Sequence, residues 1–237
     1  MSSKAKKKAA VLLPDFNLRE VEGKTLQQKR TIQAFSKGYN LLLHGTAGTG
    51  KSFLAMWLSL KEILAGKYSK LILIRSSVPA RNSGFLPGDH EEKAAIFEPP
   101  YINICTNLFN RKDAYETLKT REFIDFQTTS YLRGLTFDDA IIFADEIQNY
   151  NYQELRTVIT RAGNNSKFIF AGDFYQNDLY RNLNDQSGVE EFMDVIDLMP
   201  EFELIEFGPE DIVRGGICKS FILSELQLAE EEGSASD

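Results

Sequence analysis

Short apolar runs alternate along the chain with longer segments in which apolar positions recur every three or four residues. The runs lie at 41–44, 71–75, 140–145, 167–172 and 202–207. In the third run, positions 141–144 are consecutively apolar rather than alternating, which is typical of a strand covered on both faces. The runs therefore predict the strands of a parallel sheet that has helices on either side.

The longer segments predict helices at 26–37, 51–65, 151–162 and 189–198. Three of them are followed directly by glycine, the residue that most easily adopts the left-handed conformation at a helix end; these are Gly38, Gly66 and Gly163. The repeated strand-helix order predicts an α/β fold with a doubly wound, mostly parallel sheet and helices on both faces. Prolines and glycines interrupt the segment 76–101, so no continuous helix or strand is expected there.

A glycine-rich segment joins the first predicted strand to the helix after it. Residues 45–52 read GTAGTGKS and satisfy the P-loop pattern G-x-x-x-x-G-K-[ST]. In such a loop, backbone N–H groups at a helix N-terminus surround phosphate, and glycine lets the chain wrap without a Cβ in the way. A glycine-rich turn that only caps a helix needs no lysine at this place, so the lysine favours nucleotide binding.

The P-loop pattern assigns chemistry to individual residues. Lys51 is expected to reach the β- and γ-phosphates of ATP as a catalytic residue, and the Ser52 hydroxyl is expected to ligate Mg²⁺. The residues expected to surround the phosphates are Gly45, Thr46, Ala47, Gly48, Thr49, Gly50, Lys51 and Ser52.

Two carboxylates come at the end of the apolar run 140–145. Asp145 and Glu146 are expected at the edge where open α/β sheets bind ligands. Asp145 is expected to hold Mg²⁺ directly or through water, and Glu146 to act as the general base that orients the attacking water. Adjacent acids are most often solvated turn residues, and it is the P-loop elsewhere in the chain that favours the catalytic interpretation.

The next predicted strand ends in Ala171-Gly172-Asp173-Phe174-Tyr175-Gln176. If this strand is the neighbour of the acidic one, Gln176 lies near the γ-phosphate, where its amide can bond both a phosphate oxygen and water. Gln176 is therefore a candidate catalytic sensor. Without the P-loop and the acidic pair it would be an ordinary turn residue.

Composition and charge narrow the function classes. The two cysteines and two histidines are not clustered, which argues against a zinc site or a disulfide framework and favours a reducing compartment. No run reaches the roughly 18 apolar residues of a spanning helix, so no membrane association is expected. A net charge of −7 gives no generally basic surface for nucleic acid, although it does not exclude a local groove.

The expected domain organisation follows from the two charged ends. The chain begins with four lysines within its first eight residues and ends in an acidic segment. We expect a basic, flexible arm over 1–20, one ATPase domain over 21–225 and an acidic, disordered tail over 226–237.

Six short segments, in order, resemble those of the PhoH-like ATPases, whose P-loop domain is similar to the first motor lobe of superfamily 1 helicases. They lie at 25–29, 84–89, 131–137, 145–149, 172–176 and 210–214, and the resemblance covers about residues 25–222. It implies a RecA-like P-loop fold that binds ATP and Mg²⁺. The chain departs from the family pattern at Ser76, where proline is usual, and at Ile147, where alanine is usual; both departures bear on the groove beyond the γ-phosphate.

The resemblance also implies roles for four further residues. Gln28 resembles the glutamine that reads the adenine edge, which would favour ATP over GTP. Arg75 and Arg133 resemble basic residues of the site region. Arg214 resembles an arginine that approaches the γ-phosphate, in its own chain or as an arginine finger for a neighbouring subunit, where such a group raises hydrolysis by about 10³ to 10⁵. Each arginine has the alternative of an ordinary ion pair.

The leading functional hypothesis is an Mg²⁺-dependent ATPase that works on single-stranded RNA or DNA. Helicases of this kind need two motor lobes and this chain has one P-loop, so a homo-oligomer is expected, with a hexameric ring favoured. The alternatives are an ATP-dependent switch or binding module acting on a protein partner, and a small-molecule phosphotransferase. The resemblance implies a cytoplasmic location in a bacterial cell, or in an infected one if the protein is viral.

Overall fold

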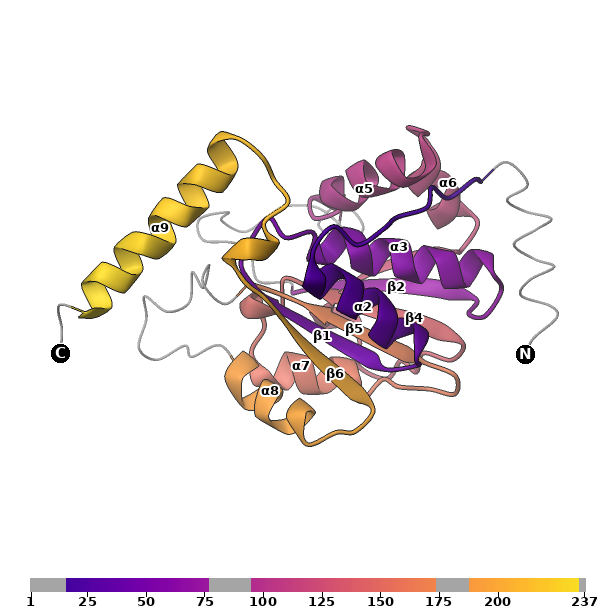
Figure 1. Cartoon of the computed structure of the whole chain (residues 1–237). Helices are drawn as coiled ribbons and strands as arrows, with labels where there is room; N and C mark the ends of the chain where they lie inside the picture. The colour runs from indigo at the N-terminus through magenta and orange to yellow at the C-terminus, as the bar shows by residue number, and fades with distance from the viewer. Residues whose placement is uncertain (1–15, 77–94, 174–187, 235–237) are drawn as a thin grey trace.

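The protein is built around one six-stranded parallel sheet. The computed structural model describes residues 16–76, 95–173 and 188–234, with side chains up to 228. The strands stand in the order β3-β2-β4-β5-β1-β6, and every neighbouring pair is parallel (Figure 1). They are β1 (Asn40–Gly45), β2 (Lys70–Arg75), β3 (Ile124–Thr128), β4 (Ala140–Asp145), β5 (Lys167–Ala171) and β6 (Phe202–Phe207).

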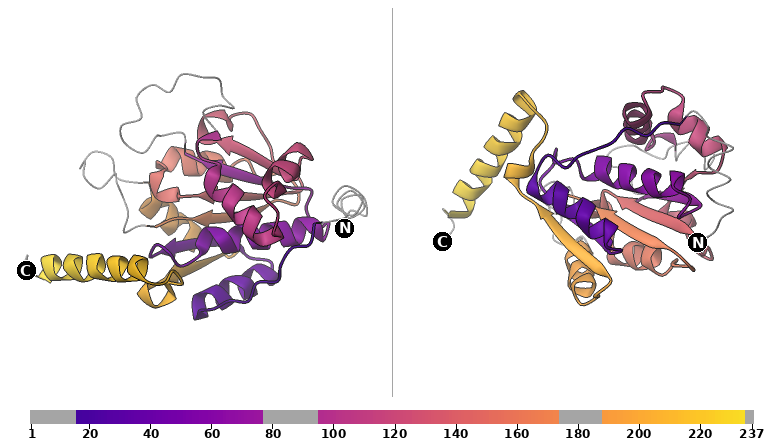
Figure 2. Two further views of the ribbon diagram at one scale, coloured as in Figure 1. Left: turned by 90° about the horizontal axis from the view of Figure 1, so that it is seen from above. Right: turned by 45° about the vertical axis from the view of Figure 1, so that its right-hand side comes forward.

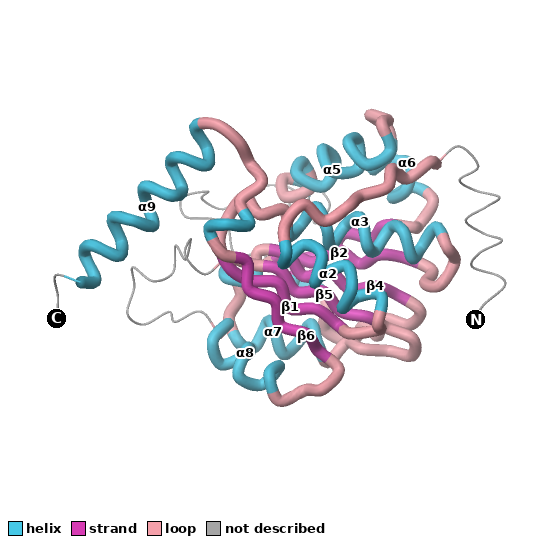
Figure 3. Tube along the Cα trace, in the orientation of Figure 1, coloured by secondary structure: helices cyan, strands magenta, loops and turns pink. Residues whose placement is uncertain are grey.

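Helices cover both faces of the sheet (Figure 3). One face carries α2 (Leu26–Ser36), α3 (Lys51–Leu64), α5 (Pro99–Phe109) and α6 (Ala114–Thr120), and the other carries α7 (Tyr152–Ile159) and α8 (Val189–Asp197). Short 3-10 turns lie at Thr129–Tyr131, Ile147–Asn149 and Pro209–Asp211. The last helix, α9 (Ile217–Ser234), projects away from the body (Figure 2). Within the described residues, no helix is both long and apolar enough to span a bilayer.

Two hydrophobic cores, one on each face, explain why the central strands are consecutively apolar. In β4, Ile141 and Phe143 belong to the core under α3 and α5, whereas Ile142 and Ala144 belong to the core under α7 and α8. All four are fully buried, because successive side chains of a strand point to opposite faces. The predicted α/β fold with a doubly wound parallel sheet is confirmed.

The helix-ending glycines follow the prediction in two cases of three. Gly38 and Gly66 have positive φ angles of 102° and 71°. The prediction for Gly163 was wrong, because Gly163 is not among the left-handed glycines. Its amide donates to the carbonyl oxygen of Phe137, and a Cβ here would come within 2.8 Å of that carbonyl carbon. Glycine is needed there for close backbone approach.

The described ends of the chain differ from the expected arm and tail. Phe16 is buried, the Arg19 amide donates to Leu108 O at 3.0 Å, and the Trp57 indole donates to Arg19 O at 3.0 Å. Residues 16–20, placed by the sequence in a flexible arm, are therefore held against α3 and α5. At the other end α9 continues to Ser234, through residues that include good helix formers such as leucine, alanine and glutamate.

The buried side chain of Lys167 is expected to make the stability of the protein depend on pH. Its side chain is buried, Nζ donates to Phe35 O at 3.1 Å, and burial lowers its pKa from 10.5 to about 8. Between these two values the unfolded chain binds more protons at this position, so the free energy of unfolding rises with pH. We expect the stability of the natural protein relative to Lys167→Met to increase from pH 8 to pH 10.5, as measured by urea unfolding.

Substitution of the exposed Lys37 by methionine is the matched control for Lys167, and its stability difference should show no such increase over this pH range. A difference between the natural protein and Lys167→Met that stays constant from pH 8 to pH 10.5 would contradict the prediction.

Candidate active site

The loop between β1 and α3 has the wrapped conformation that its glycines predicted. Gly45, Gly48 and Gly50 have positive φ angles of 107°, 74° and 88°. Gly45 also lies so close to β6 that an added Cβ would collide with the carbonyl group of Phe207. The loop therefore depends on glycine both for its dihedral angles and for its packing, and it delivers the N-terminus of α3 to the sheet edge.

Lys51, the first residue of α3, points back into this loop. Its Nζ donates to Gly45 O and Thr46 O, both at 2.8 Å, and lies 3.4 Å from Thr49 Oγ1. Burial lowers the pKa of Lys51, while the nearby carboxylates of Asp173, Glu146 and Asp145 act to raise it. The ammonium group is thus a cation held by backbone carbonyls at the centre of the loop, where phosphate is expected.

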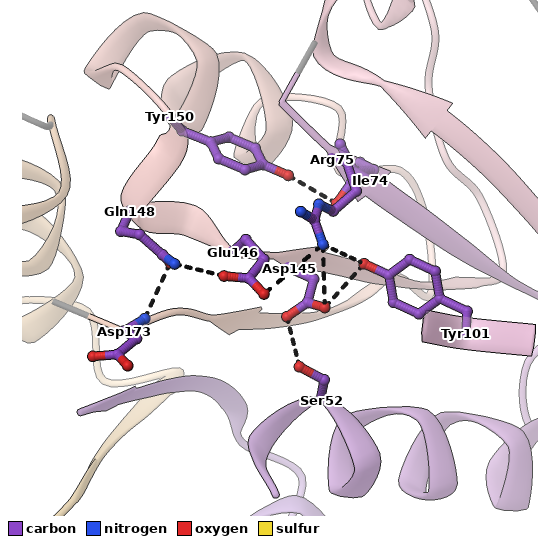
Figure 4. Close-up of polar contacts among 9 residues, drawn as sticks. All are labelled: Ser52, Ile74, Arg75, Tyr101, Asp145, Glu146, Gln148, Tyr150 and Asp173. Carbon is purple, nitrogen blue, oxygen red and sulfur yellow. Dashed lines mark hydrogen bonds and ion pairs between the residues drawn. The ribbon is translucent and has the colours of Figure 1, made fainter. Parts of the chain in front are cut away.

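Ser52 and Asp145 meet although they are 93 residues apart in the sequence. The Ser52 hydroxyl donates to Asp145 Oδ1 at 2.9 Å, which joins the start of α3 to the end of β4 (Figure 4). The two oxygens are hard donors of the kind that Mg²⁺ prefers. Among the described residues no cluster of three or more His, Cys, Asp or Glu side chains is built for a metal. One carboxylate and one hydroxyl suit Mg²⁺, which usually takes one or two carboxylates and completes its shell with substrate phosphates and water.

The second oxygen of Asp145 is held from another direction. Tyr101, on α5, donates its phenol proton to Asp145 Oδ2 at 2.9 Å, and Arg75 Nη1 lies 4.0 Å from the same oxygen. Burial, and after it the neighbouring Glu146, raise the pKa of Asp145, whereas Arg75, Ser52 and Tyr101 lower it, and the net result is a pKa of about 6. These three partners favour the ionised carboxylate that a cation needs.

Glu146 has an unusual backbone conformation. Its φ and ψ of 54° and 48° are left-handed, which is uncommon for a residue with a Cβ and is one of the backbone features that recur at functional sites. Its Oε2 accepts from Gln148 Nε2 at 2.5 Å, and its Oε1 lies 4.0 Å from Arg75 Nη1. The carboxylate is only partly buried, so it is both oriented by neighbours and open to water.

Gln148 joins the ends of β4 and β5. Its Nε2 donates to Glu146, and its Oε1 accepts from the backbone amide of Asp173 at 3.0 Å. A Cβ on Gly172 would lie 2.8 Å from Gln148 Oε1, so the glycine before Asp173 leaves room for this bridge. β5 is the direct neighbour of β4, which is the arrangement that a sensor glutamine after β5 needs. Gln176 itself lies outside the described residues.

Gln28 is placed against the phosphate loop. It is buried, its Nε2 donates to Thr49 O at 2.8 Å, and its Oε1 accepts from the Lys24 amide at 2.8 Å. These bonds fasten the start of α2 to the P-loop. Recognition of adenine by Gln28 stays a prediction.

Arg214 also lies beside the P-loop of its own chain. Its amide lies 3.4 Å from Gly48 O, to which the Val213 amide donates at 3.1 Å. Arg214 Cγ and Cδ are each 3.6 Å from the position that a Cβ on Gly48 would take. The residue is exposed, and the base of its side chain lies against the loop.

The two arginines that the resemblance assigned to the site region are separated. Arg75 contacts both acids, as described above, whereas Arg133 lines a surface pocket of about 490 Å³ together with Arg156 and Arg161. No described contact links Arg133 to Lys51, Asp145 or Glu146.

Sequence reasoning missed two residues of the site. Gln148 stands in the same short segment as the acids, Asp145-Glu146-Ile147-Gln148, and its spacing from Glu146 was the signal available. Tyr101 follows two prolines at the end of an irregular segment, and no local pattern indicates that it reaches β4.

Comparison with known proteins places this geometry in a family. The model of the family described as PhoH-like protein matches residues 20–224. A PhoH-like protein of Bacillus subtilis (strain 168) is 32% identical over 205 residues, covering 86% of this chain and 63% of the relative. One from Synechocystis sp. is 37% identical over 160 residues, covering 67% and 48%. The chain thus spans about half to two thirds of the length of these curated relatives.

Matches to solved structures are weak. The Sulfolobus solfataricus SWI2/SNF2 ATPase core in complex with dsDNA is 13% identical, with a TM-score of 0.47, over 82% of this chain and 46% of that one. The Pif1 helicase from Candida albicans is 17% identical, with a TM-score of 0.37, over 80% and 40%. The family match, in contrast, extends over most of the sequence and includes the P-loop and both acids. This chain therefore belongs to the PhoH-like family.

Proposed function

We propose that this protein hydrolyses ATP to ADP and phosphate with Mg²⁺. The observation that carries the proposal is the convergence of Lys51, Ser52, Asp145 and Glu146, from two segments far apart in the sequence, at the carboxyl edge of one sheet. Ser52 and Asp145 would hold the cation, which stabilises the charge that develops on the transferred phosphoryl group. Lys51 would bind the β- and γ-phosphates.

Glu146 is the proposed base. Its carboxylate is tethered by Gln148 on one oxygen and faces Arg75 with the other, so it can accept a proton from water without moving far. The two adjacent carboxylates of Asp145 and Glu146, with an amide group beside them, suit the activation of water better than the capture of an acceptor hydroxyl. This argues against a phosphotransferase. Gln176 as a sensor is retained in the proposal on the sequence alone.

Arg214 is proposed to act in the site of its own chain. Its contact with Gly48 supports this over an arginine finger that reaches a neighbouring subunit. The self-assembly expected from a single motor lobe is supported instead by α9, on which Ile217, Phe221 and Leu228 are 89%, 61% and 59% exposed. A hexameric ring remains our proposal, and sedimentation as a monomer with and without ATP would contradict it.

Coupling to single-stranded RNA or DNA is the second part of the proposal. The pocket lined by Arg133, Arg156 and Arg161 offers positive charge to a phosphate backbone on an otherwise acidic chain. We expect single-stranded nucleic acid to stimulate ATP turnover, and the stimulation to fall steeply with salt because counterions are released on binding. The test measures turnover with single-stranded and duplex RNA and DNA at several salt concentrations.

The alternative is an ATP-dependent switch acting on a protein partner. Stimulation by a protein, with none by any nucleic acid in the panel, would favour the switch and contradict the motor. The Arg156→Gln variant, which removes one charge from the pocket, should keep unstimulated turnover and require more nucleic acid for half-maximal stimulation. An unchanged requirement would show that the pocket is not the nucleic-acid site.

A further inference from the structure

Tyr101 is a buried phenol that contacts the site from a separate helix. It is the third residue of α5 and is fully buried. Its ring packs edge-on against Phe143 of β4, with centroids 6.4 Å apart, and against Phe126 of β3 at 6.0 Å. The ring is therefore fixed by the core, and only its hydroxyl group points into the polar site (Figure 4).

The direction of the hydrogen bonds around this hydroxyl is determined by chemistry. Arg75 Nη1 lies 3.4 Å from the Tyr101 oxygen, and that oxygen lies 2.9 Å from Asp145 Oδ2. An arginine can only donate and an ionised carboxylate can only accept. The phenol therefore accepts from Arg75 and gives its single proton to Asp145, in a chain whose bonds polarise one another.

Both oxygens of Asp145 accept hydrogen bonds. Oδ2 is taken by Tyr101, and Oδ1 points to the Ser52 hydroxyl at 2.9 Å. A carboxylate held at one end only can rotate about its terminal bond, because that torsion is broad. With both oxygens held, Oδ1 stays beside the Ser52 hydroxyl, the pair of donors proposed for Mg²⁺.

We propose that Tyr101, supported by Arg75, is a positioning residue that orients the Asp145 carboxylate toward the divalent cation. It acts through Asp145 and touches neither nucleotide nor water itself. The inference rests on the proposed function, since it assigns Asp145 to the cation. It goes further by giving α5 a defined part in building the site.

The test compares Tyr101→Phe with the natural protein in the binding of ADP carrying a fluorescent N-methylanthraniloyl label, with no turnover to complicate the readout. Binding is titrated in EDTA and again over a series of Mg²⁺ concentrations. Loss of a side chain that orients a metal ligand typically weakens metal binding by about 10- to 100-fold. We expect the Mg²⁺ concentration needed for half of the metal-dependent gain in affinity to rise by about this factor, while affinity in EDTA stays unchanged.

Tyr115→Phe is the matched control. Tyr115 is also fully buried, on the neighbouring helix α6. Burial raises the pKa of its phenol, and the nearby groups that raise it further are Glu98, Cys105 and Glu116 rather than Asp145. Its variant should show the Mg²⁺ requirement of the natural protein. An unchanged requirement in Tyr101→Phe, or equal rises in both variants, would overturn the inference.

Two features of the binding experiment separate a role of Tyr101 from partial unfolding and from failure of the proposed function. The comparison of Mg²⁺ with EDTA is made on one preparation, so a fraction of unfolded protein does not imitate the effect. If the natural protein itself binds the labelled nucleotide with no dependence on Mg²⁺, the proposed function has failed. If it shows that dependence and Tyr101→Phe shows the same, only the role of Tyr101 has failed.

Discussion

Replacement of Glu146 by glutamine is expected to lower Mg²⁺-dependent ATP turnover by about 10² to 10⁴, the usual contribution of a general base. The amide has the shape of the carboxylate but accepts no proton from water. Its oxygen can still accept from Gln148 Nε2, the present partner of Glu146 at 2.5 Å, while its NH2 group takes the place of the oxygen that lies 4.0 Å from Arg75 Nη1. Release of phosphate in single-turnover and steady-state assays measures the loss.

Nucleotide affinity separates loss of the base from loss of the site. Because Glu146 is not expected to contact the phosphates, Glu146→Gln should bind ATP with the affinity of the natural protein. The matched control is Glu116→Gln, which changes an exposed glutamate on α6. This variant should hydrolyse ATP normally. Turnover at the natural rate in Glu146→Gln would remove Glu146 as the base.

How far the sequence predicts the fold depends on where each strand lies in the sheet. β4 is covered on both faces, so residues 140–144 are all apolar, and the run was recognised. β3 is an edge strand that pairs with β2 alone, and it carries the half-exposed Asp125 and Gln127 between buried positions. Its short alternating pattern was missed because a weak period over five residues resembles many loops.

Two prolines of the segment 76–101 lie in regular structure. The prolines and glycines of this segment predict no continuous helix or strand. Residues 77–94 lie outside the described residues, whereas Pro99 and Pro100 occupy the first positions of α5. Proline is well tolerated there, because the first turn has no use for its missing N–H. The structure therefore places Tyr101 on a rigid element where the sequence predicted irregular chain.

The candidate site was predictable where its chemistry follows from local spacing. Lys51 and Ser52 belong to one eight-residue pattern, and the two acids follow directly from an apolar strand, so their roles were predicted before any contact was known. Tyr101 reaches Asp145 over 44 residues and only through the packing of α5 on the sheet. Such a contact is a product of the tertiary fold, and no spacing in the chain encodes it.

The second large effect is expected for Lys51→Ala, which should leave no detectable ATP turnover and greatly weakened nucleotide binding. Lys51 is the cation at the centre of the phosphate loop, and removing one group of this kind, which stabilises charge in the transition state, typically costs about 10² to 10³ in rate. Here the loss of phosphate binding adds to that cost. Filter binding of labelled ATP and phosphate release measure the two effects separately.

The thermal stability of Lys51→Ala distinguishes loss of the phosphate site in a folded protein from loss of the fold itself. Burial lowers the pKa of Lys51, which means that the surrounding fold disfavours its charged form. Three oxygens in the loop lose their donor in the variant, so a thermal midpoint of unfolding near that of the natural protein is the evidence that the variant is still folded. Lys61→Ala, at an exposed position of the same helix, should keep full turnover. If Lys51→Ala hydrolysed ATP at the natural rate, the P-loop would not be the catalytic phosphate site, and the proposal built on it would be wrong.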